Sequence, residues 1–231
     1  MKTTAIIVAA GRGNRMNSDI PKQYIEINGH AILYYTIRAF EESFIDDIVL
    51  VVPEGDEEYC RQQFQTKYNF KKIKAIVAGG KNRYDSVYAG LKSVVECDYV
   101  FIHDGARPFI KNATIKAALD AVQIHKACVV AVPVKDTIKI ADEEGFVAGT
   151  PNRSTMWSVQ TPQVFDYNLI KAAYDSLLAN DLTSEDIATI TDDAMVVERA
   201  TGIKVKLVTG EYDNIKITTP EDLSLAKERL K

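Results

Sequence analysis

The sequence has few cysteines, and none of them has the spacing of a metal site. The three thiols, Cys60, Cys97 and Cys128, lie far apart and are odd in number. No CxxC pair is present, so neither a disulfide framework nor a zinc site built on thiolates is indicated. We therefore expect reduced, structural thiols in a reducing compartment.

Long apolar runs and an excess of basic residues are missing as well. The first apolar run, Ala5–Ala10, stops at Gly11 and is too short for a signal-peptide core or a membrane span. The net charge of −4 opposes general binding to nucleic acid or membrane surfaces. It leaves room for a few placed cations that bind a small anionic substrate. These absences favour a soluble, cytoplasmic, globular protein.

What is present is a regular alternation of short apolar runs and longer amphipathic stretches. Continuous apolar runs predict buried strands, and stretches with helical recurrence predict helices. We expect strands at Thr4–Ala9, Ile48–Val52, Ile73–Val77, Tyr99–Ile102, Cys128–Val132 and Lys204–Val208, and helices at Ile32–Phe40, Ser86–Val95, Thr114–His125, Tyr167–Leu178, Asp192–Ala200 and after Pro220. This order predicts an α/β fold: a mostly parallel sheet with helices on both faces.

Ligands of such sheets bind in the loops that follow the strands. The loops expected to matter are Ala10–Gln23, Ala78–Ser86, His103–Phe109 and Pro133–Thr137.

The alternating pattern breaks after Pro133. Thr137–Ile140 alternates polar and apolar residues, Asp142–Gly145 forms a turn, and Phe146 and Val147 follow. This predicts a β-hairpin with too little core to stand alone. Its apolar residues need a cover, and a second copy of the chain is favoured over folding back on its own domain. We expect one domain over residues 1–231, with a β-arm at about 135–155 and a homodimer formed through it.

The loop after the first strand carries the sharpest chemical signal. Gly11 and Gly13 let backbone N–H groups approach phosphate oxygens. Met16 replaces the third glycine of a dinucleotide fingerprint, and no GK[ST] follows. The loop instead offers the cations Arg12, Arg15 and Lys22, which suit a triphosphate whose charge grows as pyrophosphate leaves. The alternative is a glycine turn with surface cations.

The motifs along the chain are specific enough for a family resemblance. They are Ala9–Gly11 with Gly13, Arg15 and Met16; Pro21–Tyr24; Gly79–Gly80 with Arg83, Ser86 and Val87; His103–Pro108; Pro133–Thr137; Thr161–Gln163; Thr191–Ala194; and Asp213–Lys216. Together they resemble the 2-C-methyl-D-erythritol 4-phosphate cytidylyltransferase family over nearly the whole chain. The resemblance implies a Rossmann-like nucleotidyltransferase fold, mostly parallel with helices on both faces and a projecting β-arm. It also implies transfer of CMP from CTP to that polyol phosphate, with Mg²⁺ as cofactor. The nearest alternative is a ribitol 5-phosphate cytidylyltransferase.

The resemblance also implies roles for individual residues. The catalytic residues would be Arg15, Lys22, Arg153 and Lys216. CTP would be bound by Ala9, Ala10, Gly11, Gly13, Gly80, Arg83, Ser86, Asp104 and Ala106, with Asp104 also holding the metal. The polyol phosphate would be bound by Thr137, Arg153, Thr161, Thr191 and Lys216.

Several of these residues have a plainer interpretation that the sequence leaves open. Asp104 could pair with Arg107, Ser86 could cap a helix, and Arg153 could be a solvated charge on the arm. His103 is not expected to be a general base, because the attacking phosphate oxygen is mostly ionised at neutral pH. A non-catalytic nucleotide-binding module and a dinucleotide reductase remain as alternatives from other functional classes.

Overall fold

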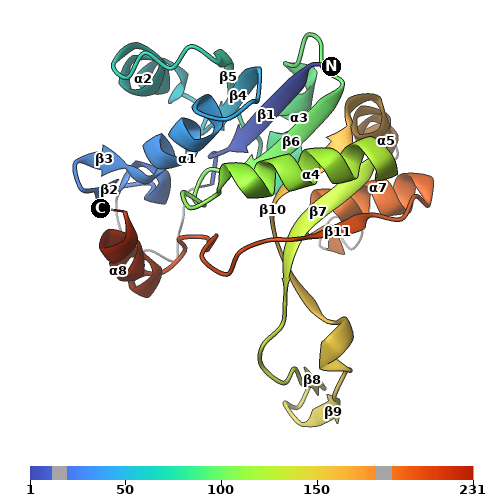
Figure 1. The fold of residues 1–231 in the computed structure, drawn as a ribbon. Helices are drawn as coiled ribbons and strands as arrows, with labels where there is room; N and C mark the ends of the chain where they lie inside the picture. Colours follow the sequence, from blue (N-terminus) through green and yellow to red (C-terminus); the bar gives the residue numbers. More distant parts are fainter. Residues whose placement is uncertain (12–19, 180–188, 231) are drawn as a thin grey trace.

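The computed structural model describes residues 1–11, 20–179 and 189–230, and its centre is a seven-stranded sheet. The strand order is β11-β7-β10-β6-β1-β4-β5 (Figure 1). The strands are β1 (Thr3–Val8), β4 (Asp47–Val52), β5 (Ile73–Ala78), β6 (Tyr99–Asp104), β7 (Ala127–Pro133), β10 (Trp157–Asp166) and β11 (Lys206–Thr209). Neighbouring strands are parallel except where β10 pairs antiparallel with β6 and β7. The predicted mostly parallel sheet is confirmed.

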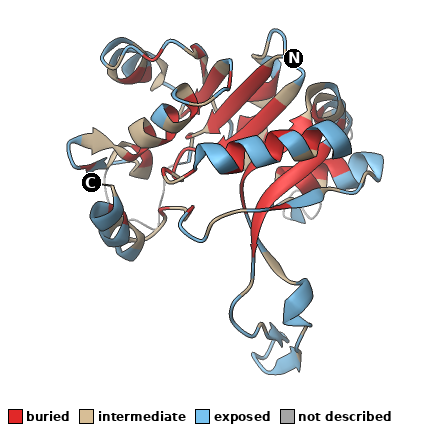
Figure 2. Cartoon of the chain, in the orientation of Figure 1, coloured by how far each residue is buried: buried red, intermediate tan, exposed pale blue. Residues whose placement is uncertain are grey.

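Helices cover both faces of this sheet (Figure 1). One face carries α1 (Ile32–Glu41), α2 (Glu57–Cys60), the adjoining π-helical turn η3 (Arg61–Thr66) and α4 (Asn112–His125). The other face carries α3 (Arg83–Lys92), α5 (Tyr167–Ala179) and α7 (Asp193–Thr201). The central strands are buried on both sides (Figure 2), which explains why they read as continuous apolar runs rather than alternating ones.

The C-terminal helix α8 (Pro220–Arg229) packs beside the N-terminal part of the chain. Its Ala226 joins Ile217, Ile32 and Ile27 in a small buried cluster. Ile27 belongs to the short hairpin of β2 (Glu26–Ile27) and β3 (His30–Ala31). No helix among the described residues is long and apolar enough to cross a membrane.

Strand β10 was not predicted, although it lies in the middle of the sheet. Pro162 interrupts its pattern, and the polar Gln160, Thr161 and Gln163 are buried in it. The register of pairing with β7 shifts between Val159 and Gln163, so the strand departs from regular alternation there. The alternation of polar and apolar residues that predicts a strand is therefore absent from this segment. The helical segment from Glu57 to Thr66 was also missed.

Helix α3 begins three residues earlier than predicted. Its N-cap is Asn82, whose backbone N–H donates to the carboxylate of Asp85 at 2.9 Å. This hydrogen bond satisfies a backbone N–H at the start of the helix that has no partner within the helix. Ser86 therefore lies inside the helix, and the interpretation of Ser86 as its cap is wrong.

The predicted β-arm projects from the sheet between β7 and β10 (Figure 1). It consists of β8 (Ile140–Ala141), β9 (Val147–Gly149) and the 3-10 turn η4 (Arg153–Thr155). Its apolar side chains are open to solvent: Ile140 is 55%, Phe146 67% and Val147 62% exposed. Figure 2 shows the arm as almost wholly exposed.

Candidate active site

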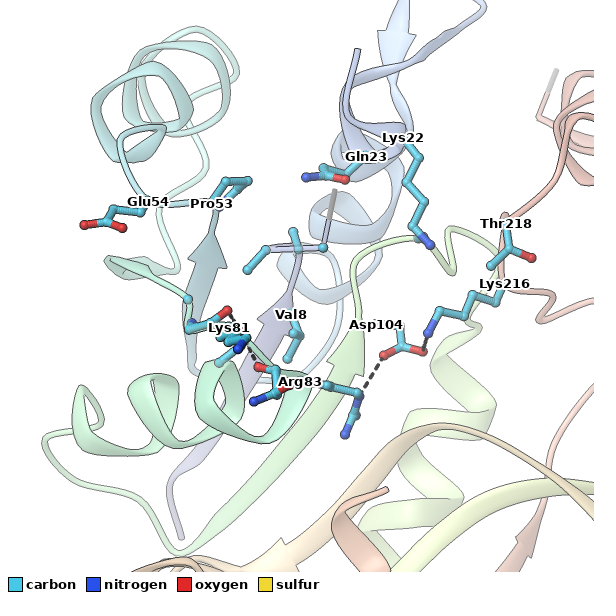
Figure 3. Close-up of a pocket in the computed structure, with 18 residues that line it drawn as sticks. Val8, Lys22, Gln23, Pro53, Glu54, Lys81, Arg83, Asp104, Lys216 and Thr218 are labelled. Atoms are coloured by element: carbon cyan, nitrogen blue, oxygen red, sulfur yellow. Dashed lines mark hydrogen bonds and ion pairs between the residues drawn. The ribbon is translucent and has the colours of Figure 1, made fainter. Parts of the chain in front are cut away.

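A cavity of about 850 Å³ opens at the carboxyl ends of β1, β4, β5 and β6 (Figure 3). This is the edge where ligands of parallel sheets bind, and the volume is typical of small-molecule sites. The lining residues are Val8, Ala9, Ala10, Gly11, Lys22, Gln23, Pro53, Glu54, Gly79, Gly80, Lys81, Asn82, Arg83, Ser86, Asp104, Ala106, Lys216 and Thr218. Three of the four loops singled out from the sequence contribute; among the lining residues there is none from Pro133–Thr137.

Two glycine-bearing loops meet on one side of the cavity. A Cβ placed on Gly79 would lie 2.3 Å from the Cβ of Ala10 and 2.8 Å from Ser86 Oγ, so no other residue fits there. Ser86 Oγ accepts a hydrogen bond from the Gly80 N–H at 3.1 Å and lies 3.1 Å from the Asn82 carbonyl, to which it donates. The hydroxyl of Ser86 therefore holds the Gly79–Gly80 loop against the start of α3.

Asp104 lies at the end of β6 and is surrounded by cations. Its carboxylate is 2.9 Å from Lys216 Nζ and 3.5 Å from Arg83 Nε (Figure 3). It also lies 3.4 Å from Arg107 Nε. Burial alone would raise the pKa of Asp104, but the charges of Arg83, Lys216 and Arg107 outweigh it and hold this pKa well below its usual range. The site therefore presents one ionised carboxylate within a cluster of positive charge.

His103 lies directly behind Asp104 and is fully buried. Its Nε2 is 3.1 Å from the Arg107 carbonyl, which can only accept, so Nε2 carries the proton. Nδ1 then accepts from Thr161 Oγ1 at 3.0 Å, and that oxygen accepts from the Asp104 N–H at 3.1 Å. Both ring nitrogens are engaged, so the imidazole has no free lone pair for a substrate proton. Thr161 supports the floor of the cavity from below.

We predict that His103 makes folding stability depend on pH in mildly acidic solution. Burial lowers the pKa of His103 from 6.5 to about 4. Between these values the unfolded chain binds a proton here and the folded protein does not, so stability falls as pH falls. Urea unfolding should show a loss of about 2 kcal/mol from this residue between pH 7.5 and pH 5.

His103→Gln should remove this part of the pH dependence, whatever it does to stability at pH 7.5. His125 is exposed, so His125→Gln serves as the control and should leave the dependence unchanged. An unaltered pH dependence in His103→Gln would refute the assignment.

Lys22 enters the cavity from the 3-10 turn η2 (Lys22–Tyr24), and its side chain extends toward Asp104 and Lys216 (Figure 3). The turn is anchored from behind by Tyr24. Its hydroxyl donates to Asp56 Oδ2 at 2.8 Å and lies 3.2 Å from Cys60 Sγ. The anchor fixes the backbone from which Lys22 projects.

The predicted site residues fall into three groups. Those that line the cavity are Ala9, Ala10, Gly11, Lys22, Gly80, Arg83, Ser86, Asp104, Ala106 and Lys216. Gly13 and Arg15 lie outside the described residues. The remaining four, Thr137, Arg153, Thr161 and Thr191, do not line it.

Each of these four has a definite position. Thr161 is buried beneath Asp104, as described above. Thr137 and Arg153 are exposed on the arm, where Arg153 Nη1 donates to the Lys135 carbonyl at 2.9 Å. Thr191 is exposed just before α7, with its hydroxyl 3.0 Å from Met195 Sδ.

One buried residue beside the site lies in the motif Thr191–Ala194 but was given no role from the sequence. Asp193 is 0% exposed and accepts two hydrogen bonds from Arg83, at 2.9 and 2.8 Å. Asp213, the first residue of the motif Asp213–Lys216, is exposed and pairs with Arg229.

Comparison with known proteins gives a consistent result. Residues 3–231 match the family model described as IspD, 2-C-methyl-D-erythritol 4-phosphate cytidylyltransferase. Proteins with that description from Lachnospira eligens and Alkaliphilus oremlandii are each 49% identical. The alignments cover 96% of this chain and 96% of the first relative, and 100% of this chain and 95% of the second.

Solved structures agree in fold over the whole chain. The 4-diphosphocytidyl-2C-methyl-D-erythritol synthase of Anaerococcus prevotii has a TM-score of 0.85 at 38% identity, covering 99% of this chain and 96% of its own. The 2-C-methyl-D-erythritol 4-phosphate cytidylyltransferase of Francisella tularensis has a TM-score of 0.81 at 32% identity, covering 99% and 100%. With this cavity and these matches, the chain belongs to the 2-C-methyl-D-erythritol 4-phosphate cytidylyltransferase family.

Proposed function

We propose that the protein transfers CMP from CTP to 2-C-methyl-D-erythritol 4-phosphate, releasing pyrophosphate and forming 4-diphosphocytidyl-2-C-methyl-D-erythritol. The observation that carries this is the cavity itself. The two glycine-bearing loops line one side of it, Lys216 and Arg83 pair with Asp104, and Lys22 extends toward that carboxylate. Such a cavity suits a nucleoside triphosphate and a second phosphate whose charges must be brought together.

The reaction needs no general base. An oxygen of the polyol phosphate attacks the α-phosphorus of CTP, and the bond to the bridging oxygen breaks with its electron pair leaving on pyrophosphate. The second pKa of a phosphate monoester is near 6, so the nucleophile is mostly ionised at neutral pH. The occupied nitrogens of His103 are consistent with this chemistry.

Cations carry the catalysis in this proposal. Lys22 stabilises the negative charge that develops around the α-phosphorus, together with Arg15 as inferred from the sequence. Lys216, which pairs with Asp104 in this structure, holds the phosphate of the second substrate. Fixing the two reactants in line converts a bimolecular step into a nearly intramolecular one.

A divalent cation fits the site only if the triphosphate brings most of its ligands. No group of three or more acidic, histidine or cysteine side chains that could hold a metal occurs among the described residues. Mg²⁺ in nucleotide sites typically takes one or two carboxylates plus phosphate oxygens and water. Asp104 would supply such a carboxylate while sharing its charge with the neighbouring cations. When bound, the metal would neutralise phosphate charge.

The arm is the basis for proposing a homodimer. Ile140, Phe146 and Val147 are too exposed to remain uncovered on a stable arm, and Arg153 does not line the cavity of its own chain. A second copy would cover the apolar surface and bring Arg153 to the neighbouring site, where it would hold the polyol phosphate. Closed two-fold pairing is the commonest assembly of soluble proteins.

We place this activity in the cytoplasm.

Competition between two polyol phosphates tests the proposed function. With CTP and Mg²⁺, we expect pyrophosphate release with kcat/KM at least about tenfold higher for 2-C-methyl-D-erythritol 4-phosphate than for ribitol 5-phosphate. The reverse preference would replace the substrate. No turnover with either compound would instead favour a non-catalytic nucleotide-binding role.

A further inference from the structure

Arg83 connects two carboxylates that belong to different parts of the fold. Its Nε is 3.5 Å from Asp104 Oδ1 on the cavity side (Figure 3). Its Nη1 and Nη2 donate to Asp193 Oδ1 and Oδ2, at 2.9 and 2.8 Å, on the side of α7. A guanidinium is a rigid planar fork, so a bidentate bond along one edge fixes the direction of the remaining nitrogen. Asp193 therefore determines which edge of Arg83 faces Asp104.

Asp193 is itself held firmly. The Tyr174 hydroxyl, from α5, donates to Asp193 Oδ1 at 2.6 Å. The backbone N–H of Asp193 donates to Gln163 Oε1, from β10, at 3.0 Å. Asp193 and Tyr174 are both 0% exposed. A buried carboxylate with this many partners has little freedom to move, so it serves as a fixed point for Arg83.

The charge balance shows what this fixed point prevents. The single carboxylate of Asp104 faces three cationic side chains. Arg83 differs from the other two because its two Nη groups form a bidentate pair with Asp193 and leave only Nε for Asp104. If Asp193 lost its charge, that edge would be free to turn toward Asp104. Arg83 would then bind the Asp104 carboxylate through both Nη groups, and this carboxylate would no longer be available to Lys216 or to the bound nucleotide and its metal.

We propose that Asp193 is a positioning residue, which grips Arg83 and thereby keeps the Asp104 carboxylate open to the cavity. The inference rests on the proposed function, since it assumes that Asp104 serves bound CTP. Thr191, predicted to contact the second substrate, lies two residues before Asp193. Asp193 therefore connects Arg83, which lines the cavity, to the start of α7 near Thr191.

Calorimetric titration with CTP in the presence of Mg²⁺ tests this without the second substrate. Asp193→Asn is expected to raise the Kd for CTP roughly tenfold or more, and to raise the Mg²⁺ concentration needed for half-maximal binding. Tyr174→Phe is the comparison variant, because it loosens Asp193 by one hydrogen bond but leaves both bonds to Arg83 in place. Its Kd should rise by no more than about threefold over the unaltered protein.

Asp193→Glu provides a second test if the asparagine variant does not fold. It keeps the charge but moves the carboxylate by one methylene, which displaces the guanidinium and should raise the Kd for CTP by roughly threefold to tenfold. Unaltered CTP affinity in Asp193→Asn or Asp193→Glu would overturn the inference, as would equal weakening in Tyr174→Phe. Absence of CTP binding by the unaltered protein would overturn the proposed function, and this inference with it.

Discussion

Replacing Lys22 with alanine is expected to lower kcat by roughly two to three orders of magnitude, the usual cost of removing one preorganised group that stabilises transition-state charge. The ground-state affinity for CTP should change little, because the glycine-loop backbone, Ser86 and the Asp104 cluster remain. Lys22→Arg keeps the charge but not the compact ammonium, so its kcat should lie between those of the unaltered enzyme and Lys22→Ala. Pre-steady-state measurement of pyrophosphate release, together with a CTP titration, separates the two effects.

A matched control separates a local effect from a general loss of positive charge. Lys116 lies on the solvent side of α4 and pairs with Asp120, away from the cavity. Lys116→Ala removes the same formal charge and should leave kcat within about twofold, since exposed pairs contribute little. If Lys22→Ala retained a kcat within threefold of the unaltered enzyme, Lys22 would have no catalytic role.

Replacing Arg153 with alanine is expected to lower kcat/KM for the polyol phosphate roughly a hundredfold, because a guanidinium that pairs with phosphate would be lost. Folding stability and CTP affinity should not change, since Arg153 is exposed and the hydrogen bond described for its guanidinium goes to the Lys135 carbonyl. Lys139→Ala is the control on the same arm, because Lys139 is exposed and its ammonium donates to Thr150 Oγ1 at 2.8 Å. Steady-state kinetics with each substrate varied in turn measures the difference.

Mixing the two inactive variants shows which site Arg153 serves. In a random mixture of Lys22→Ala and Arg153→Ala subunits, half of the dimers are mixed, and one of the two sites in each combines an intact Lys22 with an intact Arg153. Activity should then recover to about a quarter of the unaltered level if the arm serves its neighbour. If no activity is recovered, Arg153 serves the site of its own subunit. Sedimentation of the unaltered protein as a monomer would refute the proposed homodimer.

The elements and the loops of the site were predictable where one physical requirement dominated. Strands β1, β4 and β6 are buried on both faces, so their apolar runs are continuous and easily found. The carboxyl ends of parallel strands meet at one edge, so the loops after Val8, Ala78 and Asp104 could be placed together before any coordinates. The glycines and cations in these loops then indicated phosphate chemistry.

What could not be predicted depends on contacts between distant residues. The polar residues of β10 are buried because partners far away in sequence satisfy them: Gln163 caps α7, and Thr161 joins His103 to Asp104. Asp193 lies 110 residues from Arg83, and nothing local distinguishes its carboxylate from that of Asp192. Only the folded chain shows which one is buried.

The docking of the segment around Lys216 has a consequence for folding. Lys216 reaches Asp104 because the neighbouring Ile217 N–H donates to the Ala106 carbonyl at 2.9 Å and its side chain is buried beside Ile27 and Ile32. Ile217 follows Ala106 by 111 residues and Ile27 by 190 residues, and contacts over such separations slow folding because a long loop must close before they form. The cavity is therefore completed only when this segment docks and brings Lys216 to Asp104.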